Sequence, residues 1–119
     1  MNAYDTEEDR YMTSGDLRAV RLFQTRGIAD ACSGEGGDAT FSYVMQCLGR
    51  FYGGDYGEVS ENDTAANNSD LKNGHGHVLA IYKTAHNLTD DIFIEAHIDM
   101  DRPGNIECNH VMVMYPSER

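Results

Sequence analysis

The sequence predicts a single α+β domain, in which a small antiparallel sheet carries helices packed on one of its faces. Three patterns support this fold class: apolar residues at helical spacing over 38–52, a polar stretch over 61–72 with helix start and stop signals, and three β-rich segments in the C-terminal half. A chain of 119 residues buries roughly two thirds of the surface that its unfolded form exposes. One hydrophobic core is therefore expected to hold the fold without disulfides.

The N-terminal part of the chain predicts an arm followed by a first strand. Residues 1–16 hold five acidic residues and one basic residue, with little apolar content, which favours a flexible acidic arm. The folded domain is then expected to span 17–119. The stretch RAVRLFQT (18–25) places Val20 and Leu22 on one side of an extended chain, so it predicts a short strand.

An amphipathic helix is predicted over 38–52. Asp38 is a suitable N-cap residue, and Gly53–Gly54 provides the stop. The large side chains between them recur at helical spacing, at Phe41, Val44, Met45, Leu48 and Tyr52. This spacing gives the helix one apolar face to bury.

The next stretch, GGDYGEVSENDTAANNSDLKNG (53–74), contains five acidic residues and a single base. Ser60 followed by Asp63 resembles a capping box, and the stretch ends in a helix stop, Asn-Gly. Residues 61–72 are weak helix formers, so the helix predicted there must be docked by the large apolar groups nearby, which are Tyr56, Val59 and Leu71. An ordered turn and helix is predicted in place of a calcium loop, because the ligand order of such loops is missing.

The C-terminal half predicts three strands, HVLAIYKT (77–84), DIFIEAHI (91–98) and HVMVMY (110–115). A polar link at 87–90 separates the first two, and a longer turn that contains Pro-Gly separates the last two. Successive strands joined by short links usually pair antiparallel. The predicted order of elements is therefore β-α-α-β-β-β, with the amphipathic helix across one face of the sheet.

Composition narrows the class of partner. The chain has 9 basic and 20 acidic residues and a formal net charge of −11, which argues against direct binding to nucleic acid or to an anionic membrane and permits a basic protein partner. The three cysteines are widely spaced and odd in number, which suits a reducing cytoplasm and predicts no disulfide framework. The acidic N-terminus does not resemble a signal peptide. We expect a cytoplasmic protein with no cofactor.

The pattern of turns and core positions resembles a family of small accessory proteins found on plasmids, integrative elements and phages. The resemblance covers roughly residues 20–118, and its most visible part is the turn Gly54-Asp55-Tyr56-Gly57-Glu58, where the family usually has Trp in place of Tyr. The other matching positions are Thr25, Gly27, Ile28, Asp63, Asn67, Leu71, Val78, Leu79, Ala80, Tyr82, Ile92, Phe93, Ile94, Asp101, Arg102, Tyr115, Pro116, Ser117 and Glu118. The turn at Asp101–Arg102 carries extra residues, and Cys108 and His110 are additions to the pattern.

The resemblance implies a context and no enzyme activity. Accessory proteins of this size and acidity on mobile elements are often inhibitors of host defence, including anti-CRISPR proteins. The expected function is to bind a basic host protein or ribonucleoprotein, with a CRISPR effector as one candidate, by imitating the phosphate array of a nucleic acid. The expected partner-binding residues are Asp55, Tyr56, Glu58, Glu61, Asp63, Asp70, Asp99, Asp101 and Glu107, with Phe51 or Tyr52 as a further aromatic anchor.

Two other functions stay open at this point. A small metal-assisted enzyme could use His97, Cys108 and His110, because strand alternation places Cys108 with His110, and Glu95 with His97, on shared faces. No spacing matches a zinc signature and nothing suggests an oxyanion hole, so we expect neither a metal site nor a catalytic site. Alternatively, HVMVMY could form an exposed edge strand that pairs with its copy in a homodimer.

Overall fold

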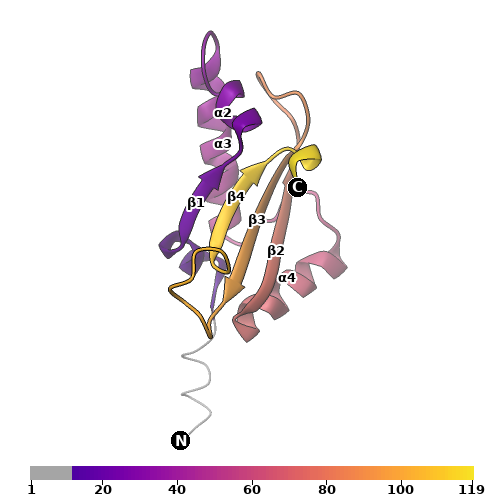
Figure 1. Ribbon diagram of the computed structural model, residues 1–119. Helices are drawn as coiled ribbons and strands as arrows, with labels where there is room; N and C mark the ends of the chain where they lie inside the picture. The colour runs from indigo at the N-terminus through magenta and orange to yellow at the C-terminus, as the bar shows by residue number, and fades with distance from the viewer. Residues whose placement is uncertain (1–11) are drawn as a thin grey trace, which may run out of the picture.

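The computed structural model describes residues 12–119 and has an α+β fold, as predicted (Figure 1). The two long helices and the three C-terminal strands all form close to their predicted positions. In chain order the elements are η1 (Ser14–Ala19), β1 (Arg21–Gln24), α2 (Arg26–Ala31), α3 (Gly37–Tyr52), α4 (Glu61–Asn73), β2 (His75–Tyr82), β3 (Ile92–Asp99), β4 (His110–Met114) and η2 (Pro116–Glu118).

The four strands form one sheet in the order β1-β4-β3-β2. β2 pairs antiparallel with β3, and β3 pairs antiparallel with β4, as predicted. β1 pairs with β4 in parallel, with Leu22 opposite Val111 and Gln24 opposite Val113, so the sheet is mixed and the prediction of a wholly antiparallel sheet is wrong in this pairing. The short-link rule covers only successive strands, whereas β1 is joined to a strand at the far end of the chain.

This order also corrects the predicted dimer edge. β4, which holds HVMVM, lies between β1 and β3 and has strands on both sides. Its backbone is therefore committed to the sheet and is not free to pair with a second copy. The two edges of the sheet are β1 and β2.

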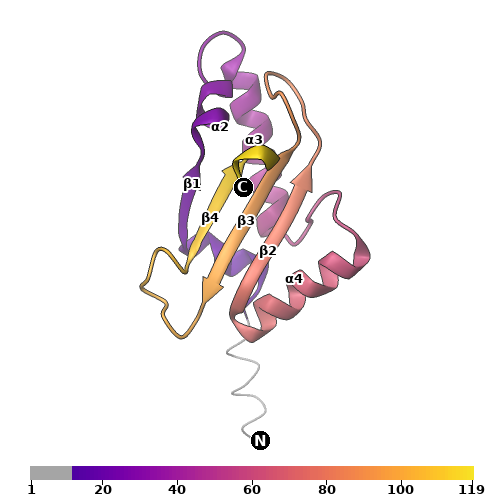
Figure 2. The same cartoon turned by 45° about the vertical axis from the view of Figure 1, so that its right-hand side comes forward.

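Helix α3 covers one face of the sheet and supplies the core with it (Figures 1 and 2). Its buried Val44, Leu48 and Phe51 join the same apolar cluster as the alternate strand residues, which are Val78, Ala80, Tyr82, Ile92, Ile94, Ala96, Val111 and Val113. Asp38 does not cap this helix: Gly36 is the N-cap, in left-handed backbone with φ of 78°, and Asp38 lies in the first turn. Within residues 12–119, no long helix covers the other face of the sheet (Figures 1 and 2).

The last residues of the predicted arm belong to the folded domain. Residues 1–11 lie outside the described residues. The backbone N–H of Met12 donates to the carbonyl of Leu71 at 3.3 Å, Thr13 is the N-cap of η1, and Leu17 is fully buried. Residues 12–16 are therefore attached to the folded domain, because η1 packs its one apolar side chain into the core. None of the helices among residues 12–119 has the length and apolar character needed to cross a membrane.

Candidate functional site

The acidic segment 53–74 is an ordered turn and helix, as predicted. Ser60 Oγ accepts a hydrogen bond from the backbone N–H of Asp63 at 3.1 Å, so Ser60 caps α4. Gly74 ends the helix in left-handed backbone with φ of 70°. Leu71 and Tyr56 are each only 3% exposed and Val59 packs against the core, which provides the docking that a helix of such weak propensity requires.

The same segment covers the outer edge of β2, and nothing in the sequence reasoning anticipated this. The backbone N–H of Ile81 donates to Tyr56 O at 3.1 Å, and its carbonyl accepts from Glu58 N at 2.7 Å. The Asn67 side chain donates to Leu79 O at 2.8 Å and accepts from Leu79 N at 3.0 Å.

One helical turn further on, the carboxylate of Asp70 accepts from His77 N at 3.0 Å. Three alternate residues of β2 thus find their outward hydrogen bonds in this segment, which replaces a fifth strand. The segment is therefore fastened along the sheet as well as by its apolar groups.

This attachment fixes the positions of the exposed acids. Glu58, Glu61 and Asp63 are exposed at the turn and at the first turn of α4, where negative charge also suits the helix dipole. Asp55 is exposed as well, but Arg50 Nε lies 2.7 Å from its carboxylate. The hydrogen bond from Arg50 is the largest cause that lowers the pKa of Asp55, and the backbone N–H of Gly57 lowers it further.

Tyr56 is a structural residue and not an exposed anchor for a partner. Its ring packs edge-on against Phe51, with 6.1 Å between centroids, and its hydroxyl donates to Asn68 Oδ1 at 3.2 Å. Burial raises the pKa of Tyr56. Phe51 is fully buried, and Tyr52 is partly buried beneath the guanidinium of Arg18, 4.9 Å from the ring centroid. Tyr56 and Phe51 are therefore core residues, as the predicted docking role of Tyr56 requires. The expected aromatic anchor at Tyr56, with Phe51 or Tyr52, stays a prediction that the burial of Tyr56 and Phe51 disfavours.

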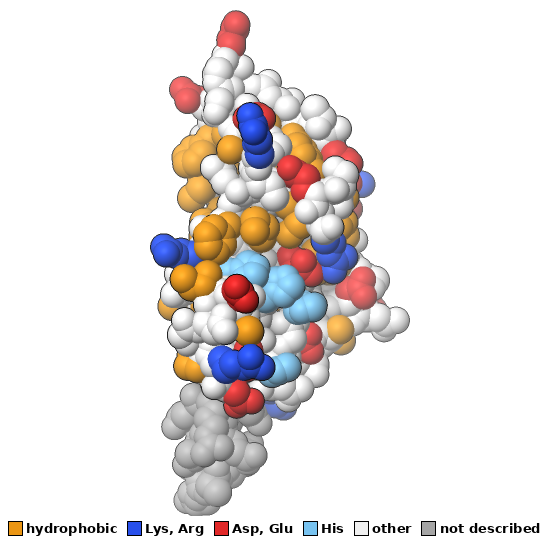
Figure 3. Space-filling model, viewed as in Figure 1, with side chains coloured by type: hydrophobic (Ala, Val, Ile, Leu, Met, Phe, Trp, Pro, Cys, Tyr) orange, Lys and Arg blue, Asp and Glu red, His pale blue; other side chains and the backbone are white. Residues whose placement is uncertain are grey.

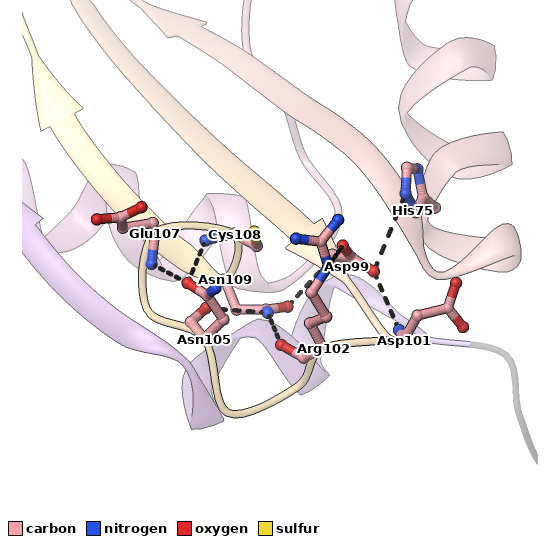
Figure 4. A network of polar contacts seen from close by, with 8 residues as sticks. All are labelled: His75, Asp99, Asp101, Arg102, Asn105, Glu107, Cys108 and Asn109. Carbon is pink, nitrogen blue, oxygen red and sulfur yellow. Dashed lines mark hydrogen bonds and ion pairs between the residues drawn. The ribbon is translucent and has the colours of Figure 1, made fainter.

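Asp99 is likewise structural. It is 6% exposed, and Figure 4 shows it at the centre of the network that shapes the loop after β3. Its carboxylate accepts from Asp101 N at 3.0 Å and pairs with Arg102 Nε at 3.3 Å, while Asn109 Oδ1 accepts from Asp99 N at 2.9 Å. The expectation that Asp99 contacts a partner is wrong for this reason, whereas Asp101 and Glu107 are exposed.

The open face of the sheet gathers three of the five histidines. His77, His97 and His110 lie opposite one another on β2, β3 and β4. Ring centroids are 4.3 Å apart between His77 and His97, and 4.8 Å apart between His97 and His110. Figure 3 shows these pale-blue side chains across the middle of the face, beside a band of hydrophobic side chains.

The electrostatics of this row disfavour the protonated form of its central ring, His97. Burial is the largest cause that lowers the pKa of His97, and the neighbouring His77 and His110 lower it further, while Glu95 opposes them. Glu95 Oε1 lies 3.6 Å from His97 Nε2, and the other oxygen of the carboxylate accepts from Arg119 at 2.9 Å. The predicted pairing of Glu95 with His97 on one face is confirmed.

The arrangement does not provide the metal site of the enzyme alternative. Among residues 12–119, no group of three or more His, Cys, Asp or Glu side chains is placed to hold a metal ion. Cys108 lies at the rim of a shallow pocket of ≈ 280 Å³ with His75, His77 and His97. His110 directs Nδ1 to the carbonyl of Ile106 at 2.9 Å, so His97, Cys108 and His110 lie near one another but are not arranged as metal ligands.

Several positions that match the accessory-protein family lie together where the start of α2 contacts the C-terminal η2. Thr25 Oγ1 donates to the Glu118 carboxylate at 2.5 Å, and the backbone N–H groups of Gly27 and Tyr115 donate to it at 3.1 and 2.9 Å. A side chain at position 27 would come within 2.8 Å of that carboxylate. These positions therefore have a structural reason, which is to tie the start of α2 to η2.

Comparison with known proteins finds no family model, no curated protein and no solved structure that matches this chain. The resemblance to mobile-element accessory proteins therefore stays a prediction.

Proposed function

We propose that this protein is a non-enzymatic inhibitor encoded by a mobile element, which acts in the cytoplasm by binding a basic surface of a host nucleic-acid-handling complex. A CRISPR effector is the first candidate for that complex. The observation that carries the proposal is the attachment of the acidic segment: Glu58, Glu61 and Asp63 are exposed on backbone that is hydrogen-bonded along β2 and capped at both helix ends.

Rigid attachment matters because a flexible segment loses conformational entropy when it binds, and this loss weakens the affinity. Acids on a fixed scaffold require little further ordering when a basic channel meets them. Asp101 and Glu107 add exposed charge on a loop that is shaped by its own hydrogen bonds. With a net charge of −11, the protein would also be drawn over a distance to a groove lined by lysine and arginine.

The test measures binding of the protein to purified RNA-guided effector complexes across a range of salt concentrations. We expect the affinity to fall steeply as salt rises, because salt screens the attraction between the acids and the basic groove. We expect nucleic acid to compete, because it binds the same groove through its phosphates. An affinity that is unchanged by salt, or binding that leaves nucleic-acid binding unaffected, would contradict the proposal.

A matched pair of variants separates the fixed array from net charge alone. The first variant combines Glu58→Gln, Glu61→Gln and Asp63→Asn. The second removes three exposed acids elsewhere, through Glu35→Gln, Asp38→Asn and Asp90→Asn. We expect the first to weaken binding at least tenfold more than the second. Equal weakening would mean that only the overall charge of the protein matters.

A further inference from the structure

The opposite edge of the sheet carries an apolar groove that plays no part in the acidic surface. The groove lies between β1 and α3 and has a volume of ≈ 360 Å³. Leu22 of β1 lines it from one side, and Phe41 and Met45 of α3 line it from the other. Phe23 borders the groove, with its ring turned to the open face of the sheet against His110, 5.9 Å between centroids. Leu22, Phe23, Phe41 and Met45 are 43%, 38%, 53% and 47% exposed, and they make up four of the six exposed large apolar residues among residues 12–119.

The outer backbone of β1 is open. β1 pairs only with β4, and within residues 12–119 no strand lies on its other side. The N–H of Thr25, just after the strand, donates to Val113 O on β4 at 3.0 Å. Because backbone groups alternate along a strand, those of Leu22 and Gln24 face away from the sheet. This edge differs in kind from that of β2, where turn and helix residues take up the outward groups.

The charge around the groove is opposite to that of the protein as a whole. Arg18 precedes β1, Arg21 lies within it and Arg26 follows it, and 17–29 contains no acidic residue. The stretch 39–54, which includes most of α3, also contains none. Three arginines thus flank β1 along the chain of an acidic protein, with Arg18 over the Tyr52 ring and Arg26 paired with Asp30 at 3.9 Å.

These observations allow the occupant to be chosen. A second copy of the chain would bring a net charge of −11 toward another of −11, which opposes association. Antiparallel pairing of two β1 strands, with Leu22 opposite Phe23, would also place Arg18 of one copy beside Arg26 of the other. An extended segment with apolar residues in the middle and acids at its ends avoids the clash of arginines and instead places its acids beside them.

We propose that β1 and α3 form a docking site for an extended segment of another protein, apolar at alternate positions and flanked by acidic residues. The segment adds a fifth strand beside β1 and inserts alternate side chains into the groove between Leu22 and Phe41. Its acidic ends lie near Arg18 and Arg26. Main-chain hydrogen bonds supply affinity in this mode, while the groove and the arginines supply selection. This site goes beyond the proposed inhibitor function and shares no residue with the acidic segment.

The experiment uses the full chain and three libraries of nine-residue peptides. In the first library, five central positions alternate valine, isoleucine, leucine or phenylalanine with threonine, and two acidic residues stand at each end. The second has lysine in place of the acids, and the third has proline at the central position, where it cannot donate to a strand. We expect the first library to be enriched on the immobilised protein at least tenfold over the other two.

Protein variants locate the site. Met45→Glu places a charge in the groove, and Met100→Glu is the matched control because both methionines are 47% exposed. The best acid-flanked peptide should lose at least tenfold in affinity for the Met45→Glu protein and less than twofold for the control. Its binding should also shift the amide signals of Leu22 and Gln24.

Several outcomes would overturn the assignment. If the acid-flanked library is not enriched over the lysine library, the charge argument is wrong. If the proline library binds equally well, the segment does not bind by strand addition. A stable dimer that Met45→Glu dissociates would make a second copy the occupant. Because none of these measurements involves Glu58, Glu61 or Asp63, their failure is distinguishable from failure of the proposed function.

Discussion

Replacing Asn67 with alanine tests how the free edge of the sheet is covered. Asn67 is 5% exposed, and its amide makes one hydrogen bond to Leu79 N and one to Leu79 O, at 3.0 and 2.8 Å. In the variant, both backbone groups of Leu79 lose their partner while α4 still lies over them. The effect should therefore exceed the loss of two exposed hydrogen bonds.

The magnitude follows from the two unpaired groups. A buried polar group that loses its partner costs about 1–3 kcal/mol, so two of them cost roughly 2–4 kcal/mol when water reaches the new space only in part. Alanine recovers at most about 0.7 kcal/mol through its better helix propensity. We therefore expect Asn67→Ala to lower the free energy of unfolding by about 2–3 kcal/mol, the net of these two terms.

Urea unfolding of the variant beside Asn62→Ala gives the measurement. Asn62 is exposed on the same helix, so this control makes the same change without touching β2 and should stabilise the protein by at most about 0.7 kcal/mol through helix propensity. Amide exchange at Leu79 should accelerate in the Asn67 variant alone. If the two variants unfold within 0.5 kcal/mol of each other, the idea that side chains of α4 complete the sheet edge is wrong.

Three further predictions concern the pH response and the turns. Stability should fall as pH drops below about 6.5, the ordinary pKa of histidine, because folding lowers the pKa of His97 and the unfolded chain then binds a proton more readily than the folded chain. The free energy of unfolding of His97→Gln should therefore depend less on pH between pH 7 and 5. Burial opposes the charged form of Glu118, but hydrogen bonds led by that from Thr25 outweigh it and lower its pKa, so Glu118→Gln should be destabilised at pH 7 and should lose less stability than the wild type below pH 4.5. Gly57→Ala should lower the free energy of unfolding in urea by at least about 2 kcal/mol, because φ of Gly57 is 71° and the added Cβ would lie 2.0 Å from Ile81 O. Gly49→Ala, in open space on α3, should instead stabilise the protein by about 0.8–1.0 kcal/mol. Equal effects of the two substitutions would refute the close-approach argument.

Local patterns were enough to predict the two long helices and the C-terminal strands. The spacing of apolar residues predicts α3, and the cap residues Ser60 and Gly74 predict the two ends of α4. Such signals act within a few residues of one another, so they can be read along the chain. The docking role of Leu71 followed for the same reason, since a polar helix has few groups that could hold it.

Long-range partners left no comparable signal. The parallel pairing of β1 with β4 joins residues almost ninety positions apart, and no local rule specifies it. Asn67 is a poor helix former by propensity, and its role becomes clear only from its hydrogen bonds to the backbone of Leu79. Tyr56 was predicted to dock the segment to the core, and it does so at 3% exposed. Asp99 was expected to contact a partner, yet its carboxylate points inward and shapes the loop after β3.

The two edges of the sheet pose one physical problem and have opposite solutions. An uncovered strand edge offers backbone groups to any extended chain and so invites aggregation. At β2 the protein closes the edge with the segment that bears its exposed acids, which also fixes those acids in place. At β1 it leaves the edge open, with arginines around it that disfavour pairing with a second copy and permit pairing with an acid-flanked strand. Charge placed beside an open edge is a known way to exclude the wrong partner, and here it would select the right one as well.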